Sequence, residues 1–236
     1  MNTTNLKGLT GASLLIMLGL ALLGYLVGGG IKSFAEKDRY VTVKGLAERE
    51  VLADRVIWPL PFNCVGNNLN DLYNTVEKNR DIILSFLYEN GISEQEVIVA
   101  APKATDREAQ SYIPDNIKYR YNVESLITVI SPQVTKVLEL MARQADLLKQ
   151  GVVIGQDYNY QTRFEFTSLN DIKPEMVEEA TRNARAVAQK FADDSDSKLG
   201  GIRQAYQGQF SINNRDQTTP QIKLVRVVTT VDYYLK

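Results

Sequence analysis

The sequence predicts an α+β fold, in which helices pack on antiparallel-rich sheets, preceded by an apolar N-terminal segment. Runs of period-two alternation and runs of helical spacing follow one another in the mixed order β-β-α-β-β-α-β-α-β-β, which is typical of this class. The chain has 236 residues, of which 44% are hydrophobic and 23% are charged. This composition is that of a globular protein and leaves enough residues after the apolar segment to bury a core.

The apolar segment is Leu9–Ile31, which contains no charged side chain. A helix over this range would rise about 35 Å, enough to cross a hydrocarbon layer about 30 Å thick. We therefore predict an N-terminal tail at residues 1–8, a transmembrane anchor at 9–31, a linker at 32–39 and a folded domain at 40–236. The lipid bilayer is the first partner that the sequence predicts.

A cleaved signal peptide is the alternative reading of this segment. Lys7 supplies a minimal positive start, and Ser33-Phe34-Ala35 resembles a cleavage site. The apolar core is longer than that of most signal peptides, however, and Lys32 precedes the candidate site, so we favour a retained anchor. The basic residues Lys32, Lys37 and Arg39 outnumber Lys7, and counting these charges alone would keep the domain on the inner side of the membrane.

Two strands open the predicted domain. Tyr40–Val51 alternates until Gly45 breaks the run, and Arg55–Val65 is rich in branched and aromatic residues. Because Pro59 and Pro61 have no N–H to donate, we expect this second strand to be bulged or to lie at a sheet edge.

A helix and two more strands are predicted next. Apolar residues recur at helical spacing from Leu69, and Asn90-Gly91 ends this helix in a left-handed cap. The segments Gln95–Thr105 and Ile117–Ile130 alternate as strands, and the polar connection Asp106–Asn116 joins them.

The second half begins with a helix that Ser131 is expected to cap, with Pro132 at its first position. Its predicted buried stripe consists of Val134, Val137, Leu138, Met141, Ala145 and Leu148, and Gly151 closes it. A strand is then predicted at Tyr158–Thr167.

The longest predicted helix runs from Asp171 to about Lys198 and ends before Gly200-Gly201. Its expected buried stripe consists of Met176, Val177, Ala180, Ala184, Val187, Ala188 and Phe191. The last strands are predicted at Ile202–Ile212 and Ile222–Tyr234, with a polar loop between them.

Composition excludes several kinds of chemistry. The chain contains no histidine, which rules out Ser-His-Asp and Cys-His nucleophile activation. It contains one cysteine, Cys64, so no intramolecular disulfide can form. The 27 basic and 28 acidic side chains leave no surplus for binding nucleic acid. We expect no catalytic, cofactor-binding or metal site, no cofactor and no nucleic-acid partner. Cys64 is expected to be a buried, inert thiol, with a redox-active or intermolecular cysteine as the alternative.

Three groups of residues are weaker candidates for function. A solvated helix end, or a weak cation-binding loop, is expected at Asp193, Asp194 and Asp196. A salt-bridged surface or subunit contact is expected at Glu48, Glu50, Asp54 and Arg55. Cross-strand packing, or a recognition surface, is expected for Tyr112, Tyr119, Tyr121, Tyr158, Tyr160, Tyr233 and Tyr234.

Several segments in order resemble the SIMPL-domain family, also known as DUF541. They are Tyr40-Val41-Thr42-Val43-Lys44-Gly45-Leu46-Ala47-Glu48-Arg49-Glu50-Val51 followed by Ala53-Asp54-Arg55, then Gly91-Ile92, Val97-Ile98-Val99, Tyr119-Arg120-Tyr121-Asn122-Val123, the alanine-rich helix from Glu179 to Lys190, and Leu199-Gly200-Gly201-Ile202. The likeness covers residues 40–236. It departs from the family at Lys44-Gly45, where relatives more often carry two glycines or Ser-Gly.

The resemblance implies a bacterial domain exported to the periplasm or cell surface, with homo-oligomeric rings or barrels in some members and links to envelope and oxidative stress. It implies no catalytic residues. We therefore expect a non-enzymatic, single-pass inner-membrane protein that self-assembles, with its domain outside the cytoplasm. The alternatives are a binding or scaffold module, since an animal member associates with a Pelle-like kinase, and a hydrolase with an unrecognised carboxylate site.

Overall fold

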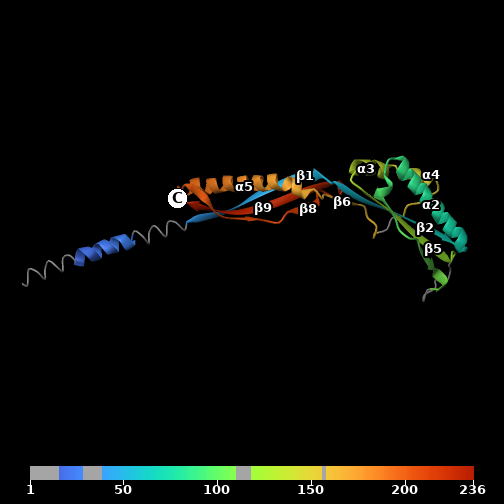
Figure 1. Cartoon of the computed structure of the whole chain (residues 1–236), viewed down its shortest axis with the longest axis horizontal. Coiled ribbons are helices and arrows are strands. Elements are labelled where there is room, and N and C mark those ends of the chain that lie inside the picture. The colour runs from blue at the N-terminus through green and yellow to red at the C-terminus, as the bar shows by residue number, and fades with distance from the viewer. Residues whose placement is uncertain (1–15, 29–38, 110–117, 156–157) are drawn as a thin grey trace, which may run out of the picture. The chain divides into compact units, whose positions relative to one another are not determined.

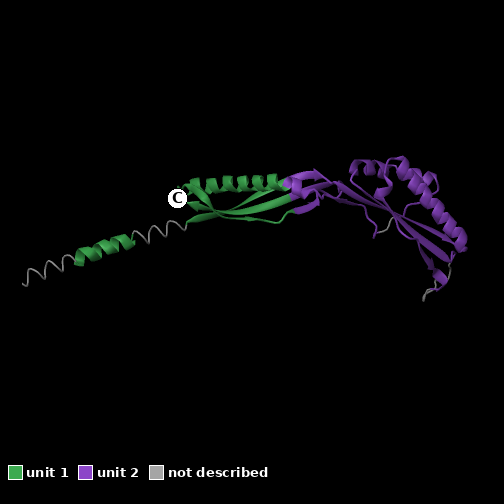
Figure 2. Ribbon diagram, viewed as in Figure 1, with its two compact units in different colours: residues 1–48, 173–210, 226–236 green, residues 49–172, 211–225 purple. Residues whose placement is uncertain are grey.

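The computed structural model describes residues 16–28, 39–109, 118–155 and 158–236. It confirms the predicted α+β class with antiparallel sheets (Figure 1). The chain divides into two compact units (Figure 2). Unit 1 comprises residues 1–48, 173–210 and 226–236, and unit 2 comprises residues 49–172 and 211–225.

The strands and helices follow the predicted order with several changes of boundary. The strands are β1 (Tyr40–Leu52), β2 (Arg55–Gly66), β3 (Val97–Val99), β4 (Lys103–Asp106), β5 (Tyr121–Ser131), β6 (Arg163–Glu165), β7 (Leu199–Gln207), β8 (Ser211–Asn214) and β9 (Ile222–Leu235). The α-helices are α2 (Leu69–Glu89), α3 (Val134–Ala142), α4 (Ala145–Lys149) and α5 (Leu169–Asp194), with 3₁₀ turns at Glu94–Glu96 and Arg107–Ala109.

Two sheets organise these elements. The first has the strand order β1-β9-β7, with β8 also paired to β9. The second has the order β3-β5-β2-β6, with β4 also paired to β5. The long antiparallel pairing of β2 with β5 sets Trp58 opposite Val129 and is the longest register in unit 2.

The predicted membrane anchor is described only in its central part, where residues 16–28 are helical and exposed. Residues 9–15 and 29–31 of the predicted span lie outside the described residues, as do the tail at 1–8 and linker residues 32–38. Among the described helices, none combines the length and the apolar character needed to cross a membrane.

In unit 1, α5 lies along β1 and β9 and buries a narrow stripe of small residues (Figure 1). Its fully buried members are Met176, Ala180, Ala184, Ala188 and Ala192. The prediction that Val187 and Phe191 belong to this stripe is wrong, because their side chains are 38% and 53% exposed. The buried residues follow one another at intervals of four along α5. Because the helix lies close to the sheet, only its alanine face fits against the strands.

Gly45 explains this close packing and corrects the expectation that it breaks the first strand. β1 continues through Gly45 without a turn. A Cβ atom placed on Gly45 would lie 1.8 Å from the carbonyl oxygen of Ala180 and 2.5 Å from the nitrogen of Ala184. The glycine is therefore required by the approach of the helix to the strand.

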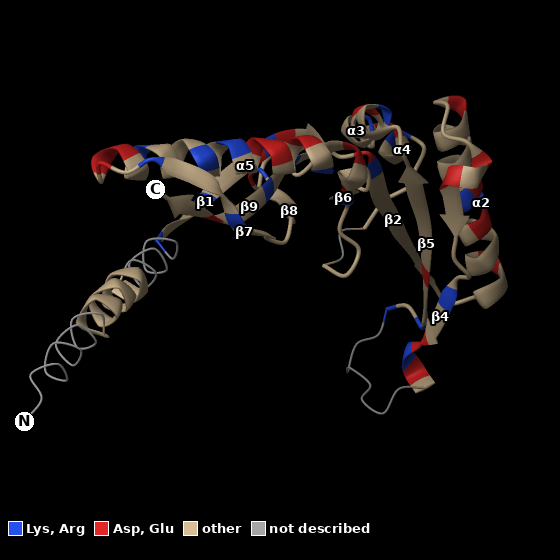
Figure 3. Cartoon of the chain, turned by 60° about the vertical axis from the view of Figure 1, so that its left-hand side comes forward, with Lys and Arg blue, Asp and Glu red and all other residues tan. Residues whose placement is uncertain are grey.

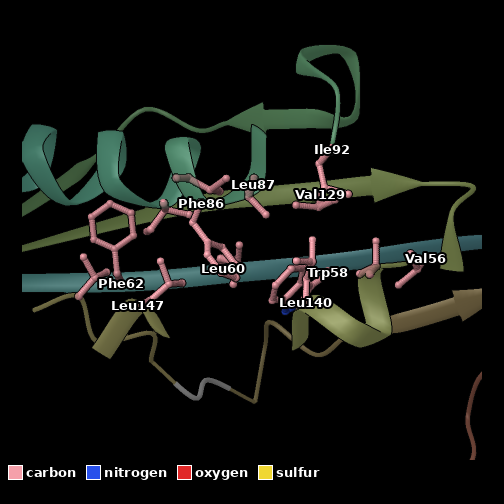
Figure 4. Close-up of a cluster of buried hydrophobic side chains, with 14 of the residues drawn as sticks. Val56, Trp58, Leu60, Phe62, Phe86, Leu87, Ile92, Val129, Leu140 and Leu147 are labelled. Carbon is pink, nitrogen blue, oxygen red and sulfur yellow. The ribbon is translucent and has the colours of Figure 1, made fainter. Parts of the chain in front are cut away.

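The core of unit 2 lies between the helices and one face of the second sheet (Figure 4). Alternate residues of β2 enter this core, namely Val56, Trp58, Leu60 and Phe62. Helix α2 buries Leu72, Val76, Ile83, Phe86 and Leu87 against them. As predicted, α2 ends at Asn90-Gly91, where Gly91 has a φ of 81°.

The helix predicted after Ser131 is divided into α3 and α4. Ser131 ends β5 instead of capping the helix, and α3 begins at Val134. The break between the two helices changes the rotational phase of the second, so that Leu147 is buried whereas Leu148 is 57% exposed. The predicted burial of Ala145 and Leu148 is therefore wrong.

The strand β2, which contains Pro59 and Pro61, is an edge strand over only part of its length. It lies between β5 and the short strand β6. Strand β6 pairs only with residues 55–57 of β2, which leaves the later residues of β2 with β5 as their one strand partner among the described residues. The carbonyl of Pro61 accepts the N–H of Gly155 at 2.7 Å on the side away from β5. Since N–H and C=O of one residue point the same way in an antiparallel strand, neither Pro61 nor Pro59 costs β5 a hydrogen bond.

Three other predicted strands are shorter in the structure. The segment Gln95–Thr105 forms a 3₁₀ turn followed by β3 and β4, and Tyr158–Thr167 contains only β6. The segment Ile202–Ile212 is divided between β7 and β8. Residues 110–117 of the predicted polar connection and following strand lie outside the described residues.

Candidate functional site

Among the predicted candidate residues, Asp54 has the carboxylate that accepts the most hydrogen bonds. Its Oδ1 accepts the backbone N–H of Thr167 at 2.7 Å and the Thr167 hydroxyl at 3.0 Å, and its Oδ2 accepts the N–H of Ser168 at 2.8 Å. Burial would raise the pKa of Asp54, but the hydrogen bonds from Ser168 and Thr167 hold it below its usual value. Thr167 and Ser168 immediately precede α5, so Asp54 satisfies donors at the start of that helix.

The other charged residues of this predicted group form separate surface ion pairs. Arg55 pairs with Glu165 at 2.5 Å, Glu50 with Arg215 at 3.2 Å, and Glu48 with Arg226 at 3.3 Å. All of these side chains are about a third or more exposed, so solvent screens the ion pairs and weakens their contribution to stability. Three of the four predicted residues therefore form ion pairs, each with a partner outside the predicted group, whereas Asp54 forms hydrogen bonds only. Its use as a subunit contact stays a prediction.

Lys223 is a charged residue that the sequence analysis missed. It is 7% exposed, and its ammonium group donates to the side-chain oxygen of Asn214. Burial lowers the pKa of Lys223, and the nearby charge of Glu165 acts in the opposite direction. Lys223 lies in an alternating apolar strand, and the sequence pattern gave no signal that its side chain would be buried. For Asp54 a signal was present, because Thr167-Ser168, which it contacts, is a recognisable helix-start pattern before α5.

The acidic residues at the end of α5 are exposed. The side-chain amide of Gln189 donates to Asp193 at 2.8 Å, and Asp196 has a φ of 50° just beyond the helix. In the part of the chain that the structure describes, no three Cys, Asp or Glu side chains are grouped closely enough to hold a metal ion.

Cys64 is half-buried in β2, and the side-chain amide of Asn79 lies 3.4 Å from its sulfur. Burial raises the pKa of the Cys64 thiol, while the hydrogen bond from Asn79 acts to lower it. A thiol with a raised pKa carries little thiolate at neutral pH, and the thiolate is the reactive form.

The predicted tyrosines are distributed over both units. Tyr119, Tyr121, Tyr158 and Tyr160 belong to unit 2, Tyr233 and Tyr234 belong to unit 1, and Tyr112 lies outside the described residues. Tyr121 has the guanidinium of Arg120 over its ring at 5.0 Å. Tyr158 and Tyr160 are exposed, whereas Tyr233 is almost fully buried.

The edges of the first sheet differ in how they are protected. On the β1 edge, Leu235 of β9 donates its N–H to the carbonyl of Arg39. Because carbonyl directions alternate along a strand, the carbonyl of Leu46 points away from β9. The side chain of Asn183 covers this carbonyl by donating to it at 2.8 Å. On the opposite edge, the N–H of Gly208 donates to the carbonyl of Val228 in β9. Because N–H directions alternate along β7, the N–H groups of Ala205 and Gln207 point away from β9. Strand β7 is exposed from Gly201 to Gln207. No other described strand pairs with its outer side. We call this side of β7 the open edge of the sheet, a surface on which another strand can pair.

Comparison with family models matches residues 41–228 to SIMPL, described as a protein of unknown function (DUF541). The match covers all of unit 2 and about half of unit 1. No curated protein matches the chain.

Proposed function

We propose, from the premise that this chain belongs to the SIMPL family (DUF541), that it is a non-enzymatic, membrane-anchored envelope protein whose β-rich domain self-assembles. The observation that carries the assembly proposal is the open edge of β7, where Ala205 and Gln207 direct their N–H groups away from β9. An exposed strand edge pairs readily with another chain unless it is covered. A membrane anchor would also concentrate copies of the domain in two dimensions.

The anchor proposal rests on residues 9–31 of the sequence and on the helix at residues 16–28. Large apolar side chains in this helix, including Ile16, Leu20 and Val27, are between 52% and 68% exposed. A helix that is apolar on all faces requires an apolar environment. Lipid would supply that environment. We further propose that the domain lies outside the cytoplasm, a proposal that the family resemblance supports.

Light scattering of the full chain in nonionic detergent tests self-assembly. We expect a defined homo-oligomer, and a monomer at all concentrations would contradict the proposal. Gln207→Pro removes an N–H from the open edge without removing a bond to β9, so it should shift the protein toward monomer while the thermal midpoint changes little. Proline at Tyr206, whose N–H points toward β9, should instead lower the midpoint.

Membrane attachment and orientation need separate measurements. Carbonate extraction of membranes should leave the full chain in the pellet, and a chain lacking residues 1–31 should appear in the supernatant. Protease added to intact spheroplasts should digest the domain. A domain protected from protease would contradict the proposed orientation.

A further inference from the structure

A groove of about 470 Å³ lies within unit 1, between α5 and the beginning of β7. The residues that determine its chemistry are Arg182, Arg185, Gly200, Gly201, Tyr233 and Glu178. Neither the assembly proposal nor the sequence analysis assigns it a role.

Two arginines of α5 enter this groove. The charges along α5 change from acidic near its start to basic in its middle, and return to acidic at its end (Figure 3). Arg182 forms only a long contact of 3.7 Å with Glu178, and both side chains are more than two-thirds exposed. Arg185 has no hydrogen bond or ion pair with any residue that the structure describes. The groove therefore contains one guanidinium that is unpaired and one that is weakly paired.

Tyr233 adds an independent observation. Its ring is buried and lines the groove, and its hydroxyl, which has no hydrogen-bond partner among the described residues, is open to solvent. Arg185 lines the same groove. Burial raises the pKa of Tyr233, and the charge of Arg185 acts to lower it. A hydroxyl that is open to solvent and has no protein partner is free to donate a hydrogen bond to a ligand beside the two arginines.

Gly201 leaves part of the opposite wall of the groove bare, whereas Gly200 packs against the backbone of Tyr234. A Cβ atom on Gly200 would lie 2.9 Å from the carbonyl oxygen of Tyr234, whereas one on Gly201 would meet nothing within 4 Å. The register of β7 with β9 shifts on both sides of Ile202, and bulges leave backbone groups outside the ladder. The wall therefore allows close approach of a ligand to the backbone.

We propose that this groove binds a phosphate group, held by Arg185, Arg182 and the Tyr233 hydroxyl. Phosphate carries up to two negative charges, which two guanidinium groups can balance, whereas a carboxylate carries only one. Glu178 is the one acidic group among the six residues, and it competes with the ligand for Arg182. The phosphate comes either from a soluble compound or from a lipid headgroup.

Site-resolved labelling of arginines with phenylglyoxal tests this proposal on the full chain in nonionic detergent. Inorganic phosphate, added at constant ionic strength, should slow the labelling of Arg182 and Arg185 in a saturable manner. Labelling of Arg226, which is exposed and lies outside the groove, should not change. Equal protection of Arg182, Arg185 and Arg226 would overturn the proposal. Absence of any protection of Arg182 and Arg185 below about 20 mM phosphate would overturn it as well.

Variants distinguish binding from a structural effect. Glu178→Gln removes the competing carboxylate and should tighten phosphate binding several-fold, whereas Glu179→Gln on the same helix should not. Tyr233→Phe keeps the ring and should weaken binding about tenfold, as expected for loss of a hydrogen bond to a charged group. A Glu178→Gln variant with unchanged or weaker affinity would contradict the assigned roles.

Two further arms identify the source and the chemistry of the ligand. Nanodiscs of phosphatidylcholine with phosphatidic acid should protect Arg185 if the phosphate belongs to a lipid. Protection by inorganic phosphate alone supports a soluble ligand at the same groove. Acetate that protects as well as phosphate does would overturn the assignment of phosphate.

Discussion

Gly45 and Ala180 lie so close that a single methyl group on Gly45 would overlap the carbonyl oxygen of Ala180. This contact joins the middle of β1 to α5 and places the alanine stripe of the helix directly on the sheet. The neighbouring clash is with the backbone of Ala184, which cannot rotate away as a side chain would.

Gly45→Ala should therefore separate α5 from β1 and destabilise unit 1 by about 3 kcal/mol, at the upper end of the cost of overpacking. Circular dichroism during thermal unfolding measures this loss. Gly66→Ala is the matched control, because its Cβ would meet Leu72 at an ordinary 3.5 Å and the expected change is below about 1 kcal/mol. Equal stabilities of the two variants would show that the close contact is not needed.

Asp54→Ala should destabilise unit 2 by about 1–2 kcal/mol, because the N–H groups of Thr167 and Ser168 lose their acceptor. Fluorescence of Trp58, the single tryptophan of the chain, reports unfolding of this unit from its core. Asp81→Ala is the control, since Asp81 makes only an exposed pair with Arg80. A larger loss in the control would contradict the assigned role of Asp54.

The stabilising effect of Asp54 should also depend on pH. Its pKa is lower in the folded chain than in the unfolded chain, where a free aspartate titrates near 4. The contribution is therefore complete above about pH 5 and is lost as the pH falls through the lower, folded pKa. Asp54→Asn should flatten the acid limb of the stability profile measured with Trp58 fluorescence. An unchanged acid limb would mean that other carboxylates dominate it.

Cys64 should react slowly with iodoacetamide in the folded chain. Its raised pKa and partial burial both reduce the accessible thiolate, so at pH 8 we expect alkylation at least about tenfold slower than in urea. Asn79→Ala removes the hydrogen bond that stabilises the thiolate and should slow the reaction further. A rate equal to that of the unfolded chain, or a disulfide-linked dimer under air, would favour the reactive alternative.

Pro59→Val should change the free energy of unfolding by less than about 1 kcal/mol. The backbone N–H that valine would add at position 59 points away from β5, so it gains no hydrogen-bond partner in that strand. Chemical denaturation followed by Trp58 fluorescence measures this. A clear gain in stability would indicate that Pro59 interrupts a sheet hydrogen bond.

Local sequence patterns predicted the parts of this fold that depend on neighbouring residues. The alternation of β2 and the cap at Asn90-Gly91 were recognisable because side-chain period and glycine conformation are properties of short segments. The anchor at residues 9–31 is a hypothesis of the same kind, since it depends on length and on the absence of charge.

Tertiary packing decided the rest. Phe191 fits a helical stripe as well as Ala192 does, and only the approach of Gly45 selects the alanine face. In the same way, the break before α4 buries Leu147 in place of Leu148, and β9 buries Lys223 beside Asn214. The groove with Tyr233 and Arg185 joins segments about fifty residues apart in the chain. By itself the sequence determined the periodicity of each element, whereas the distance between elements, which sets burial and brings remote donors together, was decided by the tertiary structure.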